Sequence, residues 1–248
     1  MADNLTEQVA GIGALAEPAR RSLYLYVAAQ PEAVSREQAA TAVDLPLHSA
    51  KFHLDRLVEE GLLDVEFRRL SGRSGPGAGR PAKLYRRSSR QLSVSLPERR
   101  YDLAGDVLAS AIDRSLASAT PVDEAVREVA REEGRRIAAG ATHSAHGRGT
   151  AGARTEDEGG PGRDVRRTAD VLAGHGYEPR VSEREICLAN CPFDRLAADH
   201  TDLVCGMNLA LIDGVLTGLG VDDLAAELDP QPGFCCVKVR GRPGGGSR

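Results

Sequence analysis

Residues 48–70 read HSAKFHLDRLVEEGLLDVEFRRL, and this stretch decides the fold of the first part of the chain. Its first part places Leu54, Leu57 and Val58 on one side of a helix and polar residues on the other. Gly61 is a typical residue at a helix C-terminus. The residues after Gly61 alternate between apolar and polar, as in a half-buried strand. The stretch therefore predicts an amphipathic helix followed directly by a strand.

Two further helices are expected before this one. The first spans Ile12 to Ala29, with Pro18 as a favourable entry residue. Ser35, followed by Glu37 and Gln38, is a typical N-cap of a short second helix. The segment DLPL, residues 44–47, then makes a tight turn. Two short helices joined by a turn, after a supporting helix, predict a helix-turn-helix.

Positive charge is concentrated just after the helix-turn-helix. Residues 67–90 contain eight basic residues and no acidic one, whereas residues 1–66 contain eleven acidic residues against five basic ones, and the formal net charge of the chain is −4. Within this window, GAGRPAKLYRR at residues 77–87 joins a glycine-rich tip to a return strand. A basic hairpin after a helix-turn-helix predicts a winged helix that binds phosphates.

The predicted partner of this domain is double-stranded DNA. Polar side chains at the start of the recognition helix can read base edges in the major groove, and the arginine at the wing tip fits a minor groove. The alternative is an ordinary amphipathic helix beside a solvated hairpin. The candidate DNA-binding residues are His48, Ser49, Lys51, Phe52 and Arg56 on the helix, and Arg69, Arg80, Lys83 and Arg86 on the wing.

The second half of the chain predicts an α+β domain. Residues 97–118 form a long expected helix, and residues 140–163 are rich in glycine and poor in apolar residues, which favours a mobile insertion. The expected domains are a winged helix-turn-helix at 1–96, a linker and dimerisation helix at 97–120, and a cysteine-bearing sensor domain at 121–248. The whole chain is therefore assigned to the α+β class.

All five cysteines lie in the last quarter of the chain, at 187, 191, 205, 235 and 236. The N-terminal residues lack the basic flank and apolar run of a signal peptide. The longest apolar-rich run, residues 203–220, is interrupted by Asp213. We therefore expect a cytoplasmic protein without a membrane partner. In a reducing compartment, an odd number of cysteines favours metal binding or redox sensing over a disulfide framework.

The candidate metal ligands are Cys191, Cys205, Cys235 and Cys236. Asn190 or Cys191 is expected to cap a helix that Pro192 begins, so the helix dipole would favour the Cys191 thiolate. Thiols from two helix starts and a strand suit an iron–sulfur cluster as readily as zinc. The alternative is that these cysteines are small buried apolar residues.

The fourth ligand is left open at this stage. Cys235 and Cys236 are adjacent in an expected strand, GFCCVKVR, so they would point to opposite faces. Cys235 shares its face with Val237 and is the expected inward ligand. The fourth position falls to Cys236 if the strand bends, to Cys187, or to His200.

Four motifs in order carry a resemblance to a known family. GRPAKLYRRS after the winged helix, NCPF, LVCGMNLAL and a late CCV strand resemble the SufR-type repressors, a branch near the ArsR-like winged-helix regulators. The resemblance covers nearly the whole chain except the 140–163 segment, and the spacing of the flanking cysteines differs from the cyanobacterial pattern. It implies a homodimeric repressor on an inverted repeat, with an iron–sulfur cluster of the four-iron type. Cys191 and Cys205 match the family's central cysteine pair.

The sequence therefore predicts a dimeric, cytoplasmic transcriptional repressor that senses iron–sulfur cluster or redox status. A regulator that responds to zinc or another metal through the same thiols is the nearest alternative. A thiol redox enzyme with Cys191 as nucleophile is a third reading, but the sequence offers it no convincing general base or cofactor motif.

Overall fold

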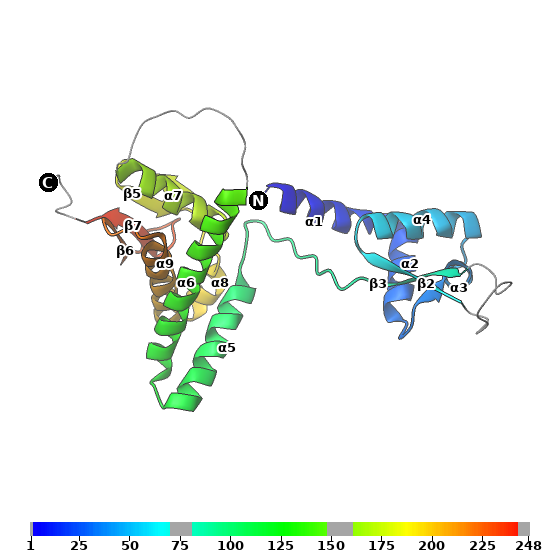
Figure 1. Cartoon of the computed structure of the whole chain (residues 1–248), viewed down its shortest axis with the longest axis horizontal. Coiled ribbons are helices and arrows are strands. Elements are labelled where there is room, and N and C mark those ends of the chain that lie inside the picture. The colour runs from blue at the N-terminus through cyan, green and yellow to red at the C-terminus, as the bar shows by residue number, and fades with distance from the viewer. Residues whose placement is uncertain (1, 70–80, 148–160, 243–248) are drawn as a thin grey trace. The chain divides into compact units, whose positions relative to one another are not determined.

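The computed structural model describes residues 2–69, 81–147 and 161–242. The chain divides into two compact units, residues 1–94 and residues 95–248 (Figure 1). The division falls close to the expected end of the DNA-binding domain at residue 96. A helix-turn-helix unit followed by a mixed helical and sheet unit confirms the α+β class.

The first unit contains the expected helices and hairpin. Its elements are α1 (Ala2–Ala14), α2 (Pro18–Ala29), β1 (Val34–Ser35), α3 (Arg36–Ala42), α4 (Leu47–Glu59), β2 (Leu63–Arg68) and β3 (Ala82–Arg87). The strands form an antiparallel sheet in the order β1-β3-β2. The sequence predicted one helix over residues 12–29, but α1 and α2 are separate.

Local capping explains where the helices of this unit begin. Pro18 begins α2, and the carboxylate of Glu17 accepts a hydrogen bond from the Ala19 amide at 3.1 Å. Ser35 caps α3 and forms a capping box with Gln38, which satisfies two amides that the helix itself leaves unpaired. Gly61, with φ of 72°, follows α4 and turns the chain into β2. The predicted N-cap at Ser35 is thus confirmed.

One apolar core holds the helices against the wing. Leu23 of α2, Leu54 and Leu57 of α4, and Leu63 of β2 are fully buried together with the ring of Tyr85 from β3. Burial of each such leucine contributes roughly 1.5–3 kcal/mol relative to exposure. The recognition helix and the wing are therefore packed on the same core.

The second unit packs helices on an antiparallel sheet. Its elements are α5 (Tyr101–Ser118), α6 (Val122–Gly147), α7 (Pro161–Ala173), β4 (Pro179–Val181), β5 (Glu185–Leu188), α8 (Asp194–Asp199), α9 (Thr201–Leu219), β6 (Leu224–Leu228) and β7 (Val237–Gly241). The strand order is β4-β5-β7-β6. The strand β5 and the last strand, β7, are neighbours.

Two boundaries differ from the sequence predictions. The segment expected as an insertion, 140–163, overlaps helices at both ends, since α6 continues to Gly147 and α7 begins at Pro161. The remaining residues of that segment, 148–160, lie outside the described part. Helix α5, expected as a separate linker, packs against α6, and its buried residues Leu103 and Val107 belong to a core that also includes residues of α9, so α5 is part of the second unit.

Helix α9 is the centre of the second unit and lies against α6 (Figure 1). It is long and apolar enough to cross a membrane by length and composition, but most of it is buried inside the protein. Leu211 faces the core shared with α5 and α6, while Ile212 and Val215 face the core shared with the sheet. An apolar helix buried on several sides is the expected form of a central core helix.

Glycines allow α6 and α9 to approach closely. A Cβ atom on Gly134 of α6 would collide with the carbonyl oxygen of Leu211, and one on Gly214 of α9 would collide with the carbonyl oxygen of Arg131. Both obstacles are backbone atoms, which cannot rotate away. The short distance between the two helices therefore depends on having glycine, which has no Cβ atom, at both positions.

We expect Gly214→Ala to destabilise the protein by about 1–3 kcal/mol, because the added methyl group forces the two backbones apart. Gly206→Ala is the matched control on the same helix, where a Cβ meets nothing within 4 Å. The control substitution is expected to leave the stability unchanged or to raise it by up to about 1 kcal/mol, because alanine has a higher helix propensity than glycine. Urea unfolding followed by circular dichroism measures both. Equal stability of the two variants would contradict the close crossing.

Candidate nucleic-acid interface and cysteine site

Helix α4 presents a defined outer face. Ala50, Leu54 and Leu57 point into the core, and the side chains of the opposite face meet solvent. Of the predicted DNA-binding residues on this helix, His48, Lys51, Phe52 and Arg56 are exposed and Ser49 is half-buried. The structure thus places all five on or beside the helix surface that faces away from the core.

Arg56 is held by carboxylates of its own helix end. Its guanidinium pairs with Glu59 at 3.2 Å and with Glu60 one residue further on. Exposed pairs of this kind contribute little stability, but they set the side chain's direction along the helix. A base contact by Arg56 would require it to leave both carboxylates.

Partly buried hydrogen bonds join the recognition helix to the wing. The Asp55 carboxylate of α4 accepts hydrogen bonds from Lys83 Nζ at 2.5 Å and from the Tyr85 hydroxyl at 3.0 Å, both on β3. Desolvation raises the pKa of Asp55, but the hydrogen bonds from Lys83 and Tyr85 outweigh it, so the pKa lies below its usual value. Lys83, predicted as a phosphate contact, is therefore also the link that fixes the wing to α4.

Other cations of the wing also have carboxylate neighbours. Arg68 pairs with Glu32 at 3.3 Å, and Arg86 approaches Asp64 at 3.7 Å. The basic segment, which has no acidic residue of its own, thus receives carboxylates from α4, from the loop after α2 and from β2. Arg69 is exposed just beyond the end of β2. Arg80 and the rest of the predicted wing tip lie outside the described residues.

Comparison with known proteins bears on this unit. Residues 15–66 match the family profile described as a helix-turn-helix domain. The N-terminal unit is a helix-turn-helix domain. The match spans α2, α3, α4 and most of β2, which is the DNA-binding part of a transcriptional regulator with a wing. A search of curated proteins found no match, and a search of solved structures found none either.

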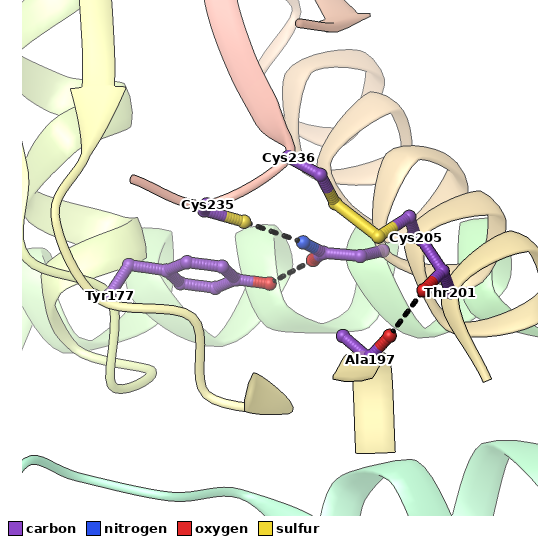
Figure 2. Close-up of a disulfide and its surroundings, with 7 residues drawn as sticks. Tyr177, Ala197, Thr201, Cys205, Cys235 and Cys236 are labelled. Carbon is purple, nitrogen blue, oxygen red and sulfur yellow. Dashed lines mark hydrogen bonds between the residues drawn. A yellow bond between two sulfur atoms is a disulfide. The ribbon is translucent and has the colours of Figure 1, made fainter. Parts of the chain in front are cut away.

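In the second unit, four cysteines lie together as two pairs. Cys205 of α9 and Cys236 form a disulfide with their Cα atoms 6.3 Å apart (Figure 2). The thiols of Cys191 and Cys235 are hydrogen-bonded to each other. Since Cys235 and Cys236 are consecutive, the two pairs are neighbours. The structure brings together all four predicted metal ligands.

A buried amide supports the pair formed by Cys191 and Cys235. Asn208 lies one helical turn after Cys205 and donates from Nδ2 to the Cys235 sulfur at 3.2 Å. Its Oδ1 accepts a hydrogen bond from the Tyr177 hydroxyl at 2.5 Å. Figure 2 shows Tyr177 and Cys235 at the two ends of this hydrogen-bonded chain. Burial raises the pKa of Tyr177 well above its ordinary value, so the hydroxyl remains a donor.

The two free thiols of the site differ in their electrostatics. The hydrogen bond that Cys191 donates to Cys235 raises the pKa of Cys191, and burial raises it further. The same hydrogen bond lowers the pKa of Cys235, which also accepts from Asn208 and from the Val237 amide. Cys235 is thus the sulfur best suited to carry negative charge, because the Cys191 thiol, the Asn208 amide and the backbone amides of Cys236 and Val237 all lower its pKa.

Two sequence-based arguments about these cysteines are wrong. Cys235 and Cys236 precede β7, which begins at Val237, so the alternation of a strand does not apply to them and both reach the site. Helix α8 begins at Asp194 after Phe193, so neither Asn190 nor Cys191 caps it and Pro192 is not its first residue. The predicted lowering of the Cys191 pKa by a helix dipole is therefore replaced by the raised pKa described above.

The other two residues considered for the fourth ligand lie elsewhere. Cys187 lies between Ile186 and Leu188 on β5, and these neighbours face the core while Cys187 is half-buried. Its thiol donates to the Glu185 carboxylate at 3.5 Å. His200 is exposed between α8 and α9. In the described part of the chain, neither residue forms a hydrogen bond with the four grouped sulfurs.

Sequence reasoning missed the polar residues that support this site. Asn208 interrupts the apolar run 203–220, which is the signal that it needs a partner inside the protein. Asn190 fixes the loop of Cys191 by donating to the carbonyl oxygens of Glu98 and Gly176 and by accepting from Arg99. No comparable signal marks Arg99, since its partners are distant in sequence.

As they stand, the described residues contain no group of three or more His, Cys, Asp and Glu side chains arranged to hold a metal ion. Two of the four grouped sulfurs are joined in the disulfide and so offer no thiolate. The donor chemistry of the set therefore depends on its oxidation state.

We expect Asp55→Asn to lower the free energy of unfolding of the first unit by about 1–2 kcal/mol at pH 7, since the charged acceptor for Lys83 and Tyr85 is lost. A carboxylate with a lowered pKa stabilises the fold above its unfolded pKa, and this stabilisation disappears as the pH falls through its folded pKa. The difference in Tm between wild type and variant should therefore begin to close as the pH falls below about 4. Asp64→Asn, which removes only the 3.7 Å pair, is the control and should change Tm less.

A second prediction concerns the buried amide. Tyr177→Phe and Asn208→Leu should each destabilise the protein by about 1–3 kcal/mol, because each leaves a buried partner unsatisfied. The double variant should cost less than the sum of the two single variants, because it removes both partners of their shared hydrogen bond. Urea unfolding of the four proteins gives the coupling energy. Strict additivity would contradict a direct Tyr177–Asn208 hydrogen bond.

Proposed function

We propose that this protein is a dimeric transcriptional repressor whose second unit senses iron–sulfur cluster or redox status. The observation that carries the proposal is the meeting of four cysteine sulfurs beside Asn208, in a chain that also has a helix-turn-helix domain. The resemblance of the motifs to SufR-type repressors supports the same reading. Helix-turn-helix regulators are usually not enzymes, and the proposed role needs no catalysis.

The cysteine set suits an iron–sulfur cluster in its donor chemistry. Cys191, Cys205, Cys235 and Cys236 would hold the cluster, since four thiolates are its ordinary ligand set. The cluster, when bound, would supply a centre that is sensitive to oxidants and iron supply. Asn208 donates to a sulfur, as groups around ligating thiolates commonly do, and so is suited to orient Cys235.

The disulfide makes loading depend on redox conditions. Two electrons and two protons, supplied by a thiol reductant, convert the Cys205–Cys236 disulfide into two thiols. Only then does the set offer four sulfur ligands. Oxidation of the empty site would reform the disulfide, so the same four residues can report either cluster supply or oxidation.

Zinc is the second candidate, because four thiolates also form a common structural zinc site. Analysis of iron, acid-labile sulfide and zinc in protein purified without oxygen separates the two candidates. Stoichiometric iron and sulfide with visible absorbance support the cluster. One zinc per chain without sulfide supports the metal-responsive alternative.

The proposed DNA target is a double-stranded inverted repeat read by two recognition helices. A homodimer would place two α4 helices in successive major grooves. Helix α5 is the proposed dimer element, as the sequence favoured. Its inner face is buried, and its exposed residues include the apolar side chains of Ile112 and Leu116, one turn apart. A regulator of this kind acts in the cytoplasm.

Coupling between the two units would proceed through the elements that carry the sulfurs. Cys191 lies in the loop before α8, Cys205 on α9, and Cys235 and Cys236 before β7. A cluster or disulfide ties these three segments together, so its loss removes a common anchor. A dimer that depends on the second unit would then hold its recognition helices at an altered spacing.

We expect operator affinity to differ by about 5- to 150-fold between the anaerobically loaded protein and the oxidised, cluster-free protein, the usual range of coupling between two sites. Non-specific affinity should change little. Cys205→Ser should lose the bound metal and this difference, whereas Cys187→Ser should retain both, because Cys187 lies on β5 away from the set. Titrations of operator and scrambled duplexes at one salt concentration provide the measurement. Equal operator affinity of the two wild-type forms would contradict the sensor role.

A further inference from the structure

A large apolar ring lies in the middle of the solvent face of α4. Phe52 is 65% exposed, although exposure of an aromatic ring of this size is unfavourable in water. It is two residues from both Ala50 and Leu54, about half a helical turn, so its ring points away from the core. The first unit therefore gains no core packing from this phenylalanine.

The side chains around Phe52 make the ring the centre of the helix surface. His53 contacts it edge-on, with 5.3 Å between ring centroids, and so limits its movement. Arg56, one turn further on, is drawn toward Glu59 and Glu60. His48, one turn before, and Lys51 are exposed beside it. An apolar ring thus stands where polar base readers are usually found.

The major groove offers one apolar group to such a ring. The base edges there are hydrogen-bond donors and acceptors, except for the 5-methyl group of thymine. A phenyl ring can make no hydrogen bond to the edges of guanine, adenine or cytosine. Lys51 beside the ring supplies the positive charge that complements the DNA backbone.

We propose that Phe52 is a specificity-determining residue that recognises a thymine in each half-site through contact with its 5-methyl group. This inference rests on the proposed function, in which α4 enters the major groove. It adds the base and the chemical group that the helix reads. Phe67, which is 66% exposed on β2, is an equally large exposed ring outside the recognition helix and provides the matched control.

The test begins with duplexes that the full-length protein enriches from a randomised pool. Each thymine of the enriched sequence is then replaced singly by deoxyuridine, which removes only the methyl group. Wild type should lose about fourfold in affinity at one thymine per half-site, the ratio expected for burying one methyl group. Phe52→Ala should bind the thymine and uridine duplexes equally. Phe67→Ala should retain the fourfold ratio, and Phe52→Leu should retain part of it.

The possible outcomes separate the two proposals. If no duplex is enriched, DNA recognition and the thymine contact both fail. If a duplex is enriched but wild type is insensitive to every uridine, or Phe52→Ala keeps the wild-type ratio, the thymine contact is overturned while DNA binding stands. If Phe52→Ala instead dissociates a dimer in sedimentation, the ring is a contact between copies and the inference is again overturned.

Discussion

The close crossing of α6 and α9 is the constraint on which the second unit depends. Gly134 and Gly214 bring the two backbones into contact, and this fixes the position of α9 among the helices and the sheet. Helix α9 in turn carries Cys205 and Asn208, one turn apart, so the crossing also sets where a sulfur and its neighbouring amide lie. A cysteine site built from a rigid core helix keeps its geometry when the loops around it move.

The Asn208 amide beside Cys235 shows how a polar group is accommodated in this core. Asn208 is 1% exposed, and a buried amide without partners would cost about 1–3 kcal/mol. Tyr177 satisfies its oxygen and Cys235 accepts from its nitrogen, so the residue is accommodated and the sulfur is oriented. Stability and the arrangement of the sulfur site therefore rely on the same hydrogen bonds.

Local sequence patterns predicted most of the first unit. Each of these signals depends on only a few neighbouring residues: the helix starts at Pro18 and Ser35, and the alternation after Gly61. The grouping of the four cysteines was also predicted, but the reasons given for Cys191 and for Cys235 were wrong. Both arguments depended on element boundaries: α8 begins two residues later than expected, and β7 begins four residues later. Such boundaries are set by tertiary contacts that the sequence does not display. The Asp55 contact and the support from Asn190 and Tyr177 join residues that are distant in sequence, so the periodicity of the sequence could not indicate them.

The ion pairs of the first unit reduce the positive charge that it can offer to DNA phosphates. Four cations of this unit each have a carboxylate neighbour in the folded protein: Arg56, Arg68, Lys83 and Arg86. Their charge is therefore already partly neutralised by the protein itself. The dependence of DNA affinity on salt measures the ions released from the phosphates that a protein neutralises. A cation that must first leave a carboxylate releases fewer ions on balance. The slope of log DNA affinity against log salt concentration will therefore be shallower for this protein than its number of arginine and lysine residues in this region implies.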